Sequence, residues 1–195
     1  MEQIILASQS PRRKQLLEWA DISFEVITKN TDEIYPENLP AEYVPVFIAQ
    51  QKALAVKNYL HKALHGAFAH RTILAADTIV VLNHSIIGKP KDRVEAIQIL
   101  SSLSDKVHHV ITGVVILHHD KEIAFAEITE VEFHPLTQEQ IEYYVDEYKP
   151  YDKAGAYAIQ EWIGVVGIKK ITGDFYNVMG LPVSKVVQAL KNLTV

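Results

Sequence analysis

An apolar run from Thr72 to Leu82, rich in β-branched residues, limits the fold more strongly than any other segment. The run lacks the apolar–polar alternation of a strand with one solvated face. It is typical of a strand buried on both faces of a sheet, which requires helices on each side of that sheet. Asp77 interrupts the run and therefore needs a separate explanation.

Other segments predict alternating helices and strands. Helices are expected after Ser10-Pro11, over 41–64, from Asp92, from the Thr137/Gln140 capping box, and after Leu181-Pro182. Strands are expected at 4–7, 23–27, 107–117, 123–133 and 165–171, with 107–133 forming a hairpin and 173–177 a loop. The pattern predicts the α/β class with a mixed sheet.

Composition narrows the class of protein. The 195 residues are 48% hydrophobic and 22% charged, which suits one large domain or two small lobes with a packed core. No cysteine is present, so disulfides, thiolate nucleophiles and cysteine-based metal sites are excluded. The apolar N-terminal run is short and lacks a preceding basic region, so we expect no signal peptide, no membrane association and a cytoplasmic location.

Charge argues against a nucleic-acid partner. The net charge of -5 opposes binding to a polyanion, so any anion site must be a local basic pocket. Ser8, Arg12 and Arg13 form the first candidate, because a strand there leads directly into a helix N-terminus. Backbone N–H groups and two arginines at that point suit a phosphate. The alternative is an exposed basic first turn.

Asp77 is the second candidate. A carboxylate within a buried strand is costly unless it is paired, hydrogen-bonded or bound to a metal, and active sites tolerate that cost. The alternative is a structural aspartate at a strand bulge or strand end. Lys52, Lys89 and Glu33 gain significance only if they converge on Asp77, where the two carboxylates would suit Mg²⁺ or Mn²⁺ and the lysines a polyphosphate.

The nine histidines show no metal-ligand spacing. His61 and His65 lack an intervening signature, and the pairs His108-His109 and His118-His119 alternate across strands. We interpret them as surface residues.

An ordered set of motifs resembles the Maf family of nucleoside triphosphate pyrophosphatases across nearly the whole chain. The motifs are Leu6-Ala7-Ser8-Gln9-Ser10-Pro11-Arg12-Arg13, Ala76-Asp77-Thr78, Gly88-Lys89-Pro90, Asp152-Lys153-Ala154-Gly155-Ala156-Tyr157 with Ile159-Gln160, and Gly180-Leu181-Pro182. The resemblance implies a single domain over 1–195, built on an elongated mixed sheet with flanking helices. It also implies two lobes around a cleft, as in inosine-triphosphate pyrophosphatases.

The resemblance also implies roles for individual residues. Asp77 corresponds to the catalytic aspartate that activates water, and Glu33 to an acidic active-site position that shares a divalent cation, Mg²⁺ or Mn²⁺, with it. The phosphate-binding positions correspond to Ser8, Arg12, Arg13, Lys52 and Lys89.

A pyrimidine-preferring branch of the family is distinguished by residues that correspond here to Arg12, Thr78 and Gln160. Glu161, directly after Gln160, departs from the family pattern. The expected activity is hydrolysis of dTTP and UTP, including modified pyrimidine nucleotides, to the monophosphate and pyrophosphate. The alternative is a nucleotide-binding regulator of cell division or septum formation whose hydrolysis is incidental. A homodimer is expected by resemblance alone.

Overall fold

The computed structural model describes residues 2–63 and 71–193, which form two compact units. The first unit comprises Met1–Asp77, Thr112–Glu127 and Gly180–Val195, and the second comprises Thr78–Ile111 and Ile128–Met179. Two units agree with the expected two lobes, while a cleft between them stays a prediction. His65 lies outside the described residues.

A seven-stranded mixed sheet has the order β2-β1-β3-β5-β6-β7, with β4 paired to β3. Strand β1 (Ile4–Leu6) runs parallel to both β2 (Phe24–Val26) and β3 (Ile73–Leu82). Strands β5 (Val107–His118) and β6 (Lys121–Phe133) are joined by a short turn, as the hairpin prediction requires. The α/β class with a mixed sheet is therefore confirmed.

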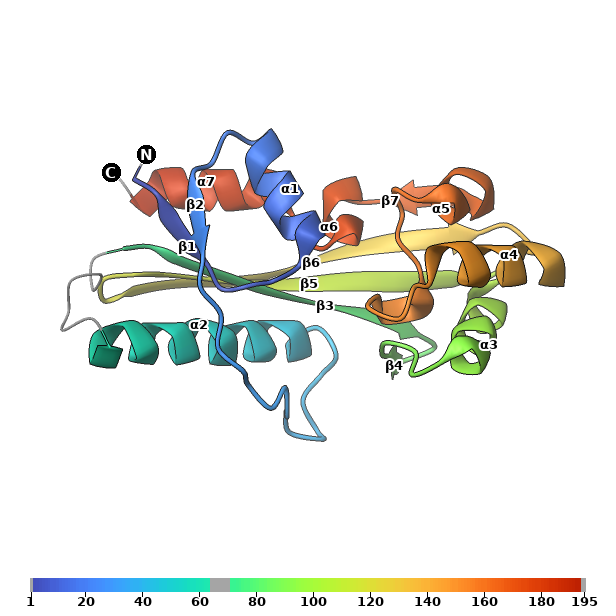
Figure 1. Ribbon diagram of the computed structural model, residues 1–195, viewed down its shortest axis with the longest axis horizontal. Coiled ribbons are helices and arrows are strands. Elements are labelled where there is room, and N and C mark those ends of the chain that lie inside the picture. The colour runs from blue at the N-terminus through green and yellow to red at the C-terminus, as the bar shows by residue number, and fades with distance from the viewer. Residues whose placement is uncertain (1, 64–70, 194–195) are drawn as a thin grey trace. The chain divides into compact units, whose positions relative to one another are not determined.

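The first unit covers its part of the sheet on both faces (Figure 1). Helix α2 (Val44–Ala63) lies on one face, and α1 (Pro11–Trp19) and α7 (Val183–Leu193) lie on the other. Strand β3 is buried along most of its length, as its composition predicts. The core between α2 and the sheet consists of Ile5, Ala7, Ala49, Ala53, Val56, Leu60, Ile73, Ala75, Val115 and Leu117.

Gly113 lets α2 approach β5 closely. A Cβ at this position would lie 2.1 Å from the backbone nitrogen of Val46 and 2.3 Å from the backbone carbon of Pro45. Because α2 begins at Val44, Pro45 lies in the first turn of the helix, where proline is tolerated, and does not kink the helix interior. This contact fixes the start of the helix that carries Lys52.

The second unit packs short helices around the remaining sheet. Helix α3 (Arg93–Leu103) contacts α4 (Gln138–Tyr148) and the 3₁₀ turn η1 (Ala154–Ala156). The capping box predicted at Thr137 and Gln140 is present. The other elements of this unit are β4 (Ser85–Ile87), α5 (Trp162–Gly167), β7 (Ile168–Thr172) and α6 (Phe175–Met179).

The predicted strand over 165–171 is wrong in its first half. Pairing of β7 with β6 extends back only to Ile168, opposite Phe133, and the Gly167 carbonyl accepts from the next amide, His134. Strand β6 ends at Phe133, so residues before Gly167 have no strand to pair with and form α5 instead. The loop predicted at 173–177 is likewise partly helical, as α6.

The interpretation of all the histidines as surface residues is wrong for His108. Its side chain is 0% exposed, because alternation along β5 turns one member of the His108-His109 pair into the core. No helix of the described residues is long and apolar enough to cross a membrane.

Candidate active site

Arg13 is unusual because its guanidinium is buried in the first turn of helix α1. It is 8% exposed, and its Nε donates to the Gly180 carbonyl at 2.8 Å while a terminal nitrogen donates to Ser8 Oγ at 3.0 Å. The Ser10 amide also donates to Ser8 Oγ, at 3.3 Å. Ser8 and Arg13 are thus held together at the turn between β1 and α1.

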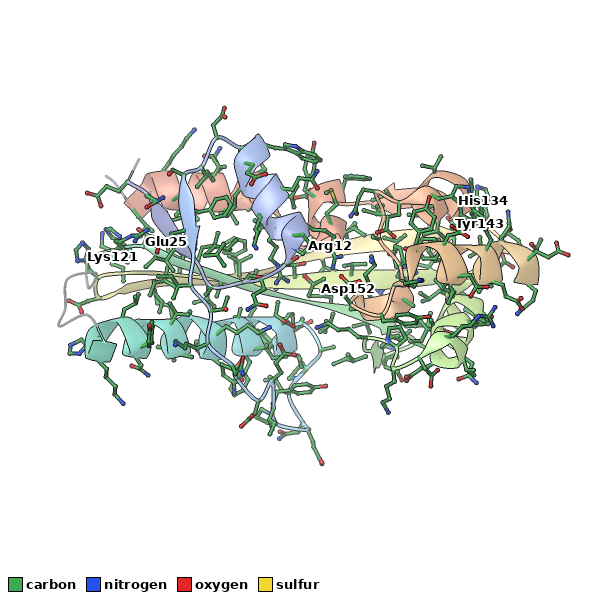
Figure 2. The ribbon with its side chains drawn as sticks, in the orientation of Figure 1. Arg12, Glu25, Lys121, His134, Tyr143 and Asp152 are labelled. Atoms are coloured by element: carbon green, nitrogen blue, oxygen red, sulfur yellow. The ribbon has the colours of Figure 1, made fainter. Side chains whose placement is uncertain are left out.

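The electrostatics of this turn favour an anion. Burial lowers the pKa of Arg13, the charge of Asp77 acts in the opposite direction, and the charge of Arg12 lowers it further. Arginine nevertheless remains charged in proteins. Arg12 is half-buried at the N-terminal end of α1 (Figure 2). The alternative of an exposed basic turn is therefore wrong for Arg13.

Lys52 connects the two carboxylates that the sequence analysis singled out. Its Nζ lies 2.7 Å from Asp77 Oδ1 and 2.6 Å from Glu33 Oε1. The Lys52 and Asp77 side chains are 18% and 14% exposed, whereas Glu33 is 50% exposed. Lys52 comes from α2, Asp77 from β3 and Glu33 from the loop before α2, so three elements of one unit converge.

This arrangement resolves the cost of a carboxylate inside β3. Asp77 is paired with a cation, and the position of Lys52 explains how the strand tolerates its charge. Lys52 and Glu33 thus meet the condition set for them, since both lie next to Asp77. The chemical roles assigned to these residues stay predictions.

Glu33 and Asp77 are also the groups that could hold a metal. Among the described residues no set of three or more histidine, aspartate or glutamate side chains is placed to bind a metal ion. Mg²⁺, however, is commonly bound by one or two carboxylates together with substrate phosphates and water. The Glu33 and Asp77 carboxylates converge on one point, which the Lys52 ammonium contacts. Two converging carboxylates fit a divalent ion bound together with a phosphate ligand.

The other candidate residues belong to the second unit. Thr78 is half-buried in β3, Lys89 is exposed after β4, and Gln160 is exposed just before α5. The segments of Lys89 and Gln160 are connected through η1, since the Gly155 amide donates to the Gly88 carbonyl at 3.1 Å. Gly155 has φ 72° and packs against Val80, where a Cβ would lie 2.8 Å from a methyl group.

The sequence did not indicate the structural roles of two further groups. The Gly180 carbonyl accepts from Arg13, whereas the sequence indicates Gly180 only as part of the Gly180-Leu181-Pro182 motif. Its φ of 116° favours glycine, but that conformation leaves no sequence signal beyond the glycine itself. Glu161 contacts both Tyr144 and Lys153, and a surface-like sequence context gave no sign of this.

Comparisons with known proteins identify the family of this chain. The family model described as Maf-like protein matches residues 3–193. A dTTP/UTP pyrophosphatase of Cytophaga hutchinsonii is 52% identical over 97% of this chain and 84% of the relative. Proteins of the same name from Parabacteroides distasonis and Phocaeicola vulgatus are 48% and 47% identical, each over 97% of this chain and 95% of the relative. The chain therefore belongs to the Maf-like protein family.

Proposed function

We propose that this protein hydrolyses dTTP and UTP to the corresponding monophosphate and pyrophosphate. The observation that carries the proposal is the group formed by Arg13, Lys52, Glu33 and Asp77, which combines fixed positive charge with two carboxylates in one unit. Relatives named dTTP/UTP pyrophosphatase, 44–52% identical to the chain, support the substrate class.

Substrate binding begins with neutralisation of the triphosphate. Arg12, Arg13 and Lys52 supply positive charge, and Ser8 Oγ lies 3.0 Å from the Arg13 guanidinium. Because the hydrogen bonds to Gly180 and Ser8 hold Arg13 in place, little reorganisation is needed when phosphate oxygens bind. Lys89, in the second unit, is proposed to bind phosphate as well.

Catalysis requires a water molecule to attack the α-phosphorus while the bond to the bridging oxygen of pyrophosphate breaks. Asp77 accepts the proton of that water, and pyrophosphate leaves. A divalent cation held by Glu33 and Asp77 would supply charge neutralisation and polarisation of the phosphate oxygens. Phosphoryl transfer depends mainly on positioning and charge stabilisation, so a single carboxylate base is sufficient.

Base selection is assigned to Arg12, Thr78 and Gln160. The Gln160 side chain is exposed and carries both an amide donor and a carbonyl acceptor. That pair can complement the mixed donor and acceptor edge of uracil or thymine. Purine edges present a different pattern, so Gln160 favours pyrimidine nucleotides.

A nucleotide panel tests the proposal. Nucleoside triphosphates are incubated with the protein and Mg²⁺ or Mn²⁺, and pyrophosphate and orthophosphate are quantified separately. We expect pyrophosphate from dTTP and UTP, and almost none with Asp77→Asn. The matched control is Asp120→Asn, an exposed aspartate in the β5–β6 turn of the same unit, which should retain activity. Saturable binding without turnover would instead support a nucleotide-binding regulator.

We also propose that residues 1–195 act as one functional domain, and that the protein is a cytoplasmic homodimer. Sedimentation equilibrium of the full chain tests the oligomeric state. A monomer at micromolar concentration would contradict the dimer.

A further inference from the structure

Tyr144 of α4 holds the chain on both sides of Gln160. Its side chain is completely buried, and its hydroxyl donates to a carboxylate oxygen of Glu161 while accepting from the Ala158 amide at 3.1 Å. One hydroxyl therefore fixes a backbone atom two residues before Gln160 and a side chain one residue after it.

Lys153 holds Glu161 from a second direction. Its Nζ lies 3.5 Å from Glu161 Oε1 and 2.8 Å from Asp152 Oδ1, and the residue is only 7% exposed. A buried ammonium requires anionic partners, so Lys153 favours a single position of the Glu161 carboxylate. Tyr144 binds the other oxygen, Oε2. Both oxygens of Glu161 thus have partners within the protein.

The backbone on either side of Gln160 is strained on one side and closely packed on the other. Ala156 adopts φ 57°, a left-handed conformation that is unfavourable for a residue with a Cβ. Gly164 lies so close to Ile159 that a Cβ there would be 1.8 Å from the Ile159 carbonyl oxygen. Gln160 is the exposed residue between these constraints.

We propose that Glu161 is a positioning residue that sets base selectivity through the network of Tyr144, Glu161 and Lys153. The inference rests on the proposed function of Gln160. Both Glu161 oxygens are engaged within the protein, so we assign the carboxylate the role of fixing the Gln160 backbone and not that of binding the base.

Tyr144→Phe is the principal test, because it removes the hydroxyl and keeps the buried ring. We expect the ratio of kcat/KM for dTTP to that for dGTP to fall by about fivefold, because the hydroxyl loses both of its hydrogen bonds but acts on the base only through Gln160. The change should lie mainly in KM for dTTP. Glu161→Ala should have a similar effect, and Glu161→Gln, which keeps an acceptor for Tyr144, should recover part of the ratio.

The matched control is Tyr143→Phe. Tyr143 is on the same helix (Figure 2), is 49% exposed and packs edge-on against Trp162, outside the network. It should keep the wild-type ratio. A folded Tyr144→Phe protein with unchanged selectivity would overturn the inference, as would an equal loss for every nucleotide. If Tyr144→Phe does not fold, the two Glu161 variants decide by the same criteria.

Hydrogen exchange separates this inference from the proposed function. In the full chain without nucleotide, we expect the amides of Ala158 to Glu161 to exchange at least about tenfold faster in Tyr144→Phe than in Tyr143→Phe, because a protecting hydrogen bond is lost. Unchanged exchange would refute the network even if dTTP is hydrolysed. Faster exchange in a protein that hydrolyses no nucleotide would refute the proposed function, and with it the role in selectivity.

Discussion

Substitution of His108 should change how the stability of the protein depends on pH. His108 is 0% exposed, and its Nε2 lies 2.8 Å from the Tyr157 hydroxyl oxygen. Its Nδ1 has no hydrogen-bond partner among the residues that the structure describes. Burial, together with the charge of His109, lowers the pKa of His108 from 6.5 to about 4. The folded protein therefore holds this imidazole neutral.

The sign of the effect follows from the lowered pKa. Between pH 6.5 and about 4 the unfolded chain binds a proton at this histidine and the folded chain does not. Stability from His108 is thus fully present above pH 6.5 and is lost as the pH falls toward 4. Linkage gives a loss of about 2 kcal/mol in the free energy of unfolding between pH 7 and pH 5 from this group.

Urea denaturation of wild-type protein and His108→Gln at pH 7 and pH 5 measures this term. Glutamine can still hydrogen-bond to Tyr157 but does not titrate. Between pH 7 and pH 5, the free energy of unfolding should fall by about 2 kcal/mol less in His108→Gln than in wild type. The control His109→Gln replaces the exposed neighbour and should behave like wild type, because burial is the main cause of the shift. Equal pH dependence in wild type and His108→Gln would refute the reasoning.

Three further substitutions test the packing and the site. In urea denaturation, Gly113→Ala should lower the free energy of unfolding by about 3 kcal/mol, because the new Cβ would clash with the α2 backbone. The control Gly88→Ala places its Cβ where no atom lies within 4 Å, so the free energy of unfolding should change by less than about 0.5 kcal/mol. Arg13→Lys should lower the free energy of unfolding by about 1.5–3 kcal/mol and raise KM for dTTP, because an ammonium cannot reproduce both guanidinium hydrogen bonds. Unchanged stability and KM would argue against the positioning of Arg13 by Gly180 and Ser8. Gln160→Ala should reduce the preference for dTTP over dGTP more than it slows dGTP hydrolysis, and equal losses in steady-state assays would contradict the assignment.

Elements with a strong local sequence pattern were predicted correctly. The buried strand expected from the β-branched residues of β3 and the capping box expected at Thr137 are both confirmed. Burial on two faces and a reciprocal cap each leave a pattern in adjacent residues. The strand predicted from Val165 is wrong in its first half, because β6 ends at Phe133, opposite Ile168. Where β6 ends is not visible in the residues around Val165. A short helix of six residues also has too few positions to show a period.

The candidate site was predictable in its residue types and not in its contacts. Asp77 within an apolar strand indicated that a partner was needed, but only the fold shows that Lys52 supplies it. Burial of Arg13 depends on the Gly180 carbonyl, 167 residues away in the chain. The Glu161 contacts depend on α4 in the same way, since long-range hydrogen bonds leave no local pattern.

Hydrolysis of dTTP in water enriched in ¹⁸O tests the central claim most directly. If water activated by Asp77 attacks the α-phosphorus, mass spectrometry should find the label in dTMP and none in pyrophosphate. Asp77→Asn should lower the rate by about 10²–10⁴-fold, the usual contribution of a general base, while Asp120→Asn should not. Label in pyrophosphate, or an Asp77→Asn protein as fast as wild type, would contradict the account.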